Sequence, residues 1–161
     1  MDKQRFDKIS GSFSQKSILV IGDVMLDKFM WGKADRISPE APVPIISVDK
    51  ISHSPGGAAN VALNLSKLSA NTHLLAIVGD DNESNLLEDN LVNDGVKVKF
   101  IKDAKKSTIT KTRIIAHGQQ VVRADYENND DITSDQIKNI KDTLYEFSTE
   151  IDAIIIEDYN K

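Results

Sequence analysis

Residues 55–62 read PGGAANVA, and this stretch decides the fold. Gly56 and Gly57 let a ligand approach the backbone, and residues 58–68 place apolar side chains near helical spacing. A helix that begins there offers free N–H groups and a positive dipole end, and the amide of Asn60 suits sugar hydroxyls. The stretch therefore predicts a ligand-binding turn; the alternative is a tight turn that only starts a helix. The sequence has neither Gly-x-Gly-x-x-Gly nor Gly-Lys-Ser/Thr, so the common dinucleotide and nucleotide-phosphate loops are absent.

Around this turn, strands alternate with helices. After a polar lead-in over residues 1–16, continuous apolar runs predict buried strands at 17–21, 73–78 and 153–156, and an alternating run predicts a strand at 96–101. Residues 82–93 and 133–147 have the apolar spacing and the N-cap signals of helices. This alternation predicts an α/β protein with a parallel sheet.

Two segments do not fit the alternation. Residues 23–55 are predicted to be irregular, except for a strand at 43–48 whose prolines favour the edge of a sheet. Residues 109–116 and 120–126 flank His117-Gly118 as the two strands of a hairpin. We expect these segments to form a small accessory sheet.

Carboxylates follow two of the predicted buried strands. Asp23 and Asp27 come after the first strand, and Asp158 comes after the last. Because ligands bind beyond the carboxyl ends of parallel strands, we expect these side chains to gather beside the PGGAANVA turn, where Asp23 and Asp27 could accept hydrogen bonds from a polyol. The alternative is that Asp23 caps a turn and that Asp27 is solvated.

The predicted hairpin carries cationic and amide side chains. They are Lys111, Arg113, Gln119, Gln120 and Arg123. A guanidinium in this position could clamp a phosphate group through two hydrogen bonds; the alternative is an ordinary solvated surface.

Composition excludes several classes of function. Twenty Lys and Arg against 25 Asp and Glu give a net charge of −5, which argues against nucleic-acid or anionic-membrane partners. The chain has no cysteine, and its three histidines are too far apart to suggest a zinc site. No apolar run approaches the length of a membrane span, and the polar N-terminus does not resemble a secretory signal, so we expect a cytoplasmic protein.

The motifs resemble a known family. Residues 56–62, GGAANVA, with Ser69 and Gly79 at their spacing, resemble the N-terminal signature of the ribokinase/PfkB carbohydrate kinases. The segments GDVMLD, RISPEAPVPI, TKTR and QQVVRADYE are similar to those of the D-glycero-β-D-manno-heptose 7-phosphate kinase domain found in bifunctional enzymes that make ADP-heptose for lipopolysaccharide. The resemblance runs from about Ile18 to Lys161.

This resemblance implies a ribokinase-like three-layer α/β sandwich with a small β-sheet lid, whose strands lie around residues 29–51 and 109–126. It implies an ATP- and Mg²⁺-dependent kinase acting on the anomeric hydroxyl of a sugar phosphate, and a homodimer formed through the lid. By motif position, the substrate-binding residues it implies are Asp27, Gly56, Gly57, Asn60, Arg113, Gln120, Arg123 and Asp158.

The chain also departs from the family. Members are about twice as long, and their second half carries the Gly-Ala-Gly-Asp motif with the general-base aspartate and the ATP-binding loops; that motif is absent here. We therefore expect residues 1–161 to be the N-terminal half of one kinase domain, truncated or from a broken or split gene, and to be inactive alone because phosphoryl transfer needs those groups. Its last strand is then expected at an unfinished sheet edge.

Two other functions remain open. One is a different PfkB-type kinase, acting on another sugar or on a nucleoside, because the PGGAANVA turn is shared across the family. The other is a non-catalytic module that binds sugar or dimerises through the lid.

Overall fold

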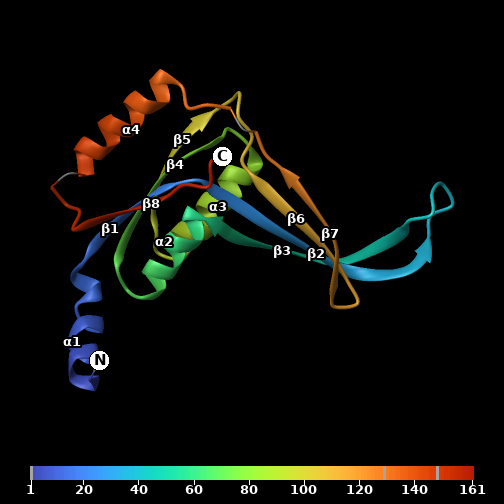
Figure 1. Ribbon diagram of the computed structural model, residues 1–161, viewed down its shortest axis with the longest axis horizontal. Helices are drawn as coiled ribbons and strands as arrows, with labels where there is room; N and C mark the ends of the chain where they lie inside the picture. Colours follow the sequence, from blue (N-terminus) through green and yellow to red (C-terminus); the bar gives the residue numbers. More distant parts are fainter. Residues whose placement is uncertain (1, 129, 148) are drawn as a thin grey trace.

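The computed structural model describes residues 2–128, 130–147 and 149–161, so Met1 of the predicted polar lead-in lies outside the described residues. The described residues form two four-stranded sheets, one on each side of the centre of Figure 1. We call them the main sheet, in the strand order β5-β4-β1-β8, and the lid sheet, in the order β3-β2-β6-β7.

The main sheet is parallel, as the sequence predicts. Its strands are β1 (Ser17–Gly22), β4 (Asn71–Gly79), β5 (Lys97–Asp103) and β8 (Ala153–Glu157). The helices α2 (Ala58–Lys67), α3 (Asn82–Asn93) and α4 (Ser134–Phe147) also lie where the sequence predicts them. Figure 1 shows α4 on the opposite side of the sheet from α2 and α3, which gives three layers.

The core lies between the main sheet and the α2–α3 layer. Val20 and Leu74 of the sheet are fully buried against Ala62 of α2 and against Leu87 and Leu91 of α3. The small alanines of α2 let this helix pack closely on the strands, because they add little volume between helix and sheet. This packing fixes the start of α2, where the PGGAANVA turn lies.

The lid sheet corrects one prediction. Residues 23–55 are not irregular: they form two long strands, β2 (Val24–Ile37) and β3 (Pro44–Gly57). β2 is central, because it pairs with β3 on one side and with β6 (Thr110–Ala116) on the other. From about Trp31 onward its side chains are partly exposed, so the strand has no apolar run to reveal it. The hairpin of β6 and β7 (Gln119–Tyr126) is confirmed, and β3 lies at an edge as its prolines indicate.

The two ends of the chain complete the fold. The lead-in is more helical than the sequence suggests, since α1 (Lys3–Ser10) is a full helix, followed by a short 3₁₀ turn at Phe13–Gln15. β8 lies at an edge of the main sheet, as predicted, and its Ile154 and Ile156 are exposed. No helix in the described part of the chain is both long and apolar enough to span a membrane.

The main sheet and the lid meet at Asp23. The chain leaves β1 through Gly22 and enters β2, and the Asp23 carbonyl accepts a hydrogen bond from the Ala58 N–H at 2.9 Å. Gly57 has φ +59°, and a Cβ atom there would lie 2.3 Å from that carbonyl oxygen. Only glycine fits this position, so α2 begins directly against the junction of the two sheets.

Candidate substrate-binding site

Asp27 and Arg113 form an ion pair on the lid sheet. Nη1 of Arg113 donates to Oδ1 of Asp27 at 2.5 Å, and both side chains are mostly covered, with 23% and 20% of their surface exposed. The Arg113 guanidinium also lies over the ring of Phe29, with Cζ 5.3 Å from its centroid. A cation–π contact and a charged hydrogen bond together hold the guanidinium in one place.

The PGGAANVA turn lies against this ion pair. Gly56 is opposite Met25 in the β2–β3 register, and a Cβ atom at Gly56 would come within 2.7 Å of Oδ2 of Asp27. The absence of a side chain at Gly56 therefore leaves the second carboxylate oxygen of Asp27 beside the start of α2. We call Asp27, Gly56, Gly57 and Arg113 the cradle.

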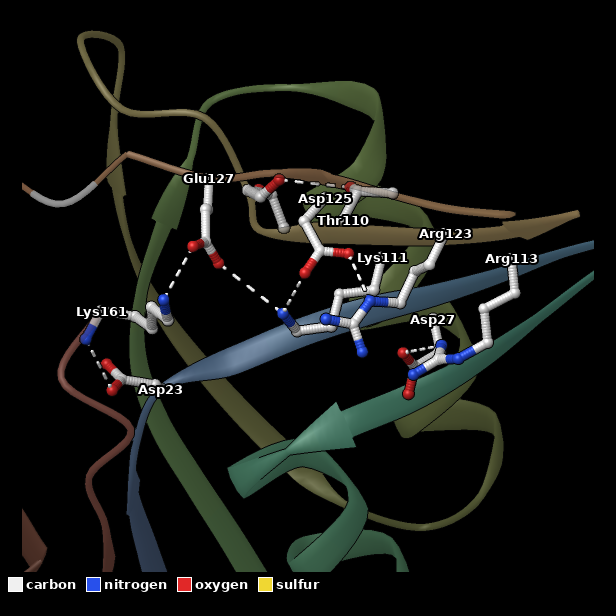
Figure 2. Close-up of polar contacts among 10 residues, drawn as sticks. Asp23, Asp27, Thr110, Lys111, Arg113, Arg123, Asp125, Glu127 and Lys161 are labelled. Carbon is white, nitrogen blue, oxygen red and sulfur yellow. Dashed lines mark hydrogen bonds and ion pairs between the residues drawn. The ribbon is translucent and has the colours of Figure 1, made fainter. Parts of the chain in front are cut away.

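A row of alternating charges continues from the cradle toward the main sheet, as Figure 2 shows. Arg123 Nε lies 2.9 Å from Asp125 Oδ1, and Asp125 Oδ2 accepts from Lys111 Nζ at 3.0 Å. Lys111 Nζ is also 3.6 Å from Oε2 of Glu127, whose Oε1 accepts from Lys161 Nζ at 2.7 Å. The row thus joins the lid hairpin to the segment after β8.

Strand register explains why the cradle and this row share one face of the lid. Asp27 pairs with Lys111 across β2 and β6, and Lys111 pairs with Asp125 across β6 and β7. Arg113 and Arg123 are partners in a neighbouring pair of the same hairpin. Side chains opposite one another in neighbouring strands point to the same side, so the face presents a carboxylate next to two guanidinium groups.

The carboxylates of the row are acids of lowered pKa. The hydrogen bond from Lys111 lowers the pKa of Asp125, with Arg123 adding to the effect, and the hydrogen bond from Lys161 lowers the pKa of Glu127. Both groups are therefore charged at neutral pH, and each neutralises the cations on either side.

The Asp23 carboxylate caps a turn, which is the second of the two roles considered above, rather than making the polyol contact. Its Oδ2 accepts from the backbone N–H of Tyr159 at 2.8 Å and of Lys161 at 3.2 Å. Its own N–H donates to the Glu157 carbonyl at 3.0 Å. Asp23 thus fixes the segment after β8 and, with it, the position of Lys161 (Figure 2).

The structure brings together some of the predicted site residues. Asp27 and Arg113 form an ion pair, and Gly56 lies beside the Asp27 carboxylate with Gly57 next in the chain. Arg123 is the β-sheet partner of Arg113, and Asn60 lies exposed in the first turn of α2. Gln120 is opposite Ile115, nearer the hairpin tip, and no contact among the described residues links it to Asp27. Asp158 is exposed and accepts from the N–H of Asn160 at 2.8 Å, in a local turn after β8.

Sequence reasoning missed Asp125, Glu127 and Lys161. The signal for the first two was available, because Arg123, Asp125 and Glu127 are spaced two residues apart and a strand of that period places them on one face. No signal linked Lys161 to Glu127, because a contact between residues 34 positions apart depends on the whole fold.

The donor set does not fit a magnesium ion. The carboxylates of the cradle and the row are each engaged by a cation, and Asp23 is engaged by backbone N–H groups. No group of three or more His, Asp or Glu side chains within the described residues is arranged to hold a metal ion.

Two cavities lie near the cradle without including it. One, of about 110 Å³, is lined by apolar side chains of the main sheet and by Ile140 of α4, with Asp23 and Lys161 among its walls. The other, of about 370 Å³, is lined by Lys28, Thr110 and Thr112, which alternate with the cradle-face residues and so point to the other side of the lid sheet.

With this geometry in view, comparison with known proteins identifies the class. The model of the pfkB family of carbohydrate kinases matches residues 15–150, and the chain belongs to this family. Among curated relatives, the bifunctional protein HldE of Helicobacter pylori (strain J99) is 47% identical over 147 residues, which cover 91% of this chain and 32% of the relative. The HldE of Aliivibrio fischeri (strain MJ11) is 38% identical over 151 residues, or 93% of this chain and 31% of the relative. The chain thus spans about a third of the length of these relatives.

Solved structures support the fold. A carbohydrate kinase from Agrobacterium tumefaciens superposes with a TM-score of 0.70 at 20% identity, over 88% of this chain and 45% of that protein. A ribokinase from Thermotoga maritima superposes with a TM-score of 0.57 at 16% identity, over 88% of this chain and 52% of that protein. The fold is therefore ribokinase-like, as the sequence resemblance implies.

Proposed function

We propose that this chain is the sugar-binding part of a kinase for D-glycero-β-D-manno-heptose 7-phosphate. The complete reaction would transfer the γ-phosphoryl group of Mg-ATP to the anomeric hydroxyl, giving the 1,7-bisphosphate used to make ADP-heptose for lipopolysaccharide. One observation carries the proposal: three members of the charged row beside the cradle, Arg123, Asp125 and Glu127, come from residues 119–127, QQVVRADYE, a segment that resembles the heptose branch of the family.

The cradle suits a sugar phosphate on chemical grounds. The carboxylate of Asp27 accepts hydrogen bonds from sugar hydroxyls, and the bare backbone of Gly56 and Gly57 lets the sugar ring approach. Asn60 supplies a further donor and acceptor from the first turn of α2. Arg113 and Arg123 present planar guanidinium groups, which bind phosphate bidentately.

Two other residues complete the proposed substrate site. Gln120, on the same hairpin as Arg123, and Asp158, after β8, would contact the substrate only once the sugar fills the space between the lid and the end of the main sheet. ATP and Mg²⁺ are proposed as cosubstrate and cofactor of the complete enzyme. Their binding groups and the catalytic base would come from outside the residues described here, so we expect no phosphoryl transfer by this chain alone.

Isothermal titration calorimetry tests the proposal directly. Heptose 7-phosphate, unphosphorylated heptose and ribose are titrated into the 161-residue chain, and we expect affinity in that descending order. Asn60→Ala removes neutral hydrogen bonds worth about 0.5–1.5 kcal/mol each, so both heptoses should bind about 2- to 12-fold more weakly. Arg123→Ala should weaken only the phosphorylated sugar, by roughly 10- to 150-fold, since a charge-assisted hydrogen bond contributes about 1.5–3 kcal/mol.

Other results would contradict the proposal. Binding of none of the three sugars to the folded chain removes sugar recognition from this site. Tighter binding of ribose than of heptose 7-phosphate points to a different sugar kinase of the same family. Equal affinities in Asn60→Ala and the parent chain remove Asn60 from the site.

We also propose that the lid mediates a homodimer. The outer part of β2 and β3, which extends beyond the hairpin in Figure 1, together with the neighbouring positions that still pair with β6, exposes apolar side chains that a second copy would cover: Trp31, Ile37, Val43, Val48 and Ile51. Sedimentation equilibrium should give a dimer for the parent chain and a monomer for a Val48→Glu, Ile51→Glu double variant. A monomeric parent chain contradicts this proposal.

A further inference from the structure

Glu127 occupies an unusual position between two lysines. Its Oε1 accepts from Lys161 Nζ at 2.7 Å, whereas its Oε2 is buried, has no hydrogen-bond partner in the described part of the chain and lies 3.6 Å from Lys111 Nζ. The three side chains have 24%, 26% and 16% of their surface exposed. Exposed ion pairs contribute little, but a largely covered carboxylate between two ammonium groups is tied to both of them.

Three parts of the fold meet at this carboxylate. Glu127 directly follows β7, Lys111 is on β6, and Lys161 belongs to the segment that Asp23 holds at the end of the main sheet. Figure 2 shows the three side chains pointing toward one another between the lid and the main sheet. Their contact therefore fixes the lid hairpin to the main sheet at the edge where the substrate is proposed to bind.

Asp125 connects Lys111 to Arg123. Lys111 Nζ is shared between Asp125 and Glu127, and Asp125 is shared between Lys111 and Arg123. Without the negative charge of Glu127, Lys111 is drawn to Oδ2 of Asp125 alone and neutralises more of the carboxylate charge that attracts Arg123 to Oδ1. About half of the Arg123 side chain is exposed, so no close packing would keep the guanidinium in place.

We propose that Glu127 is a positioning residue for phosphate recognition: through Lys111 and Asp125 it fixes the guanidinium of Arg123 on the cradle face. This inference rests on the proposed function, in which Arg123 binds the phosphate of the sugar. It makes Glu127 a determinant of selectivity for phosphorylated over unphosphorylated sugar, although Glu127 itself contacts no substrate.

The variant Glu127→Gln tests the inference because three explanations predict different results. Calorimetry with heptose 7-phosphate and heptose gives the ratio of the two affinities. If Glu127 positions Arg123, that ratio falls roughly 3- to 10-fold while heptose binding is unchanged, since part of a charge-assisted hydrogen bond is lost. If Glu127 only stabilises the lid, both sugars weaken equally and the ratio is unchanged. If Glu127 only competes with the phosphate, the ratio rises because the site has gained positive charge. The second and third results overturn the inference.

A matched control and a restoring variant complete the test. Asp94→Asn makes the same change of charge at an ion pair with Lys67, the last residue of α2, and should leave the ratio unchanged. Glu127→Asp keeps the charge and should recover most of the selectivity. If Glu127→Asp behaves as Glu127→Gln does, the inference is wrong.

One measurement is independent of the sugar. In an NMR spectrum of the ¹⁵N-labelled chain, the Arg123 Nε–Hε resonance of Glu127→Gln should move toward the position of a free arginine, and that of Asp94→Asn should not. An Arg123 resonance that does not move in Glu127→Gln overturns the inference, whether or not the parent chain binds sugar. A parent chain that binds neither sugar refutes only the proposed function.

Discussion

The substitution Gly56→Ala tests the cradle most sharply, because it adds one methyl group at a known place. The new Cβ would lie 2.7 Å from Oδ2 of Asp27 and 2.7 Å from Cγ of Met25, and real Cβ atoms do not approach other heavy atoms so closely. Met25 is flexible and can move aside, but Asp27 is held by Arg113 at 2.5 Å. The methyl group therefore displaces the Asp27 carboxylate or breaks its ion pair.

The size of the effect follows from the cost of this overlap. Forcing an extra methyl group into a packed site costs about 1–3 kcal/mol. If the overlap raises the free energy of the sugar-binding conformation by this amount, heptose 7-phosphate should bind roughly 5- to 150-fold more weakly. Heptose without the phosphate should lose a similar factor, because Asp27 is proposed to contact the sugar and not the phosphate.

The assay is calorimetry with both sugars, after circular dichroism and thermal unfolding have shown that the variant is folded. Gly95→Ala is the matched control: Gly95 has φ +84° at the end of α3, and a Cβ there would lie 3.2 Å from Ser66 Oγ. That variant should lose stability and keep its sugar affinity. Parent-like affinity in Gly56→Ala, or an equal loss in Gly95→Ala, would refute the role assigned to the cradle.

Two further predictions concern stability. Asp81→Ala removes the N-cap of α3 and the carboxylate that accepts hydrogen bonds from the Thr108 and Ser84 N–H groups, so urea unfolding should show a loss of about 2–4 kcal/mol. Burial alone would raise the pKa of Asp81, but these hydrogen bonds outweigh burial and lower it, so its contribution is present above the ordinary value of 3.8 and is lost as the pH falls through the lowered pKa. Burial lowers the pKa of His73, so its unfolded form binds the proton more readily and the free energy of unfolding should fall as the pH drops below about 6.5. His73→Leu should lose this part of the pH dependence. Burial also lowers the pKa of His53, so His53→Asn should lose only the part due to His53 and keep the part due to His73. Identical pH profiles for the parent and His73→Leu would show that His73 is not responsible.

Much of the fold could be predicted because local signals agreed with tertiary packing. The buried strands of the main sheet appear as short apolar runs, and the three helices that flank it have clear apolar spacing and clear starts. The prediction failed for β2, where Lys28, Lys33 and Arg36 interrupt the apolar residues and Gly32 suggests a break. Backbone pairing stabilises this strand on both sides as far as Gly32 and with β3 alone beyond it, and that pairing leaves little trace in the sequence.

The site was predictable only in part, for a similar reason. Asp27 and the glycines could be found because carboxyl ends of parallel strands and helix N-termini are recognisable places. The ion pair of Asp27 with Arg113 joins residues 86 positions apart, and Asp23 could not be distinguished from Asp27 by position alone. The path of the segment after β8 decides that Asp23 binds backbone N–H groups and that Asp27 is left to form the cradle.

The most direct test of the central claim is an NMR titration of the ¹⁵N-labelled chain with heptose 7-phosphate. We predict that the largest amide shifts will occur at Asp27, Gly56, Gly57 and Asn60, with smaller shifts along β6 and β7. Shifts concentrated around the cavity beneath α4 or around Lys28 on the reverse face of the lid, or no shifts at all, would contradict the assignment of the cradle as the sugar-binding site.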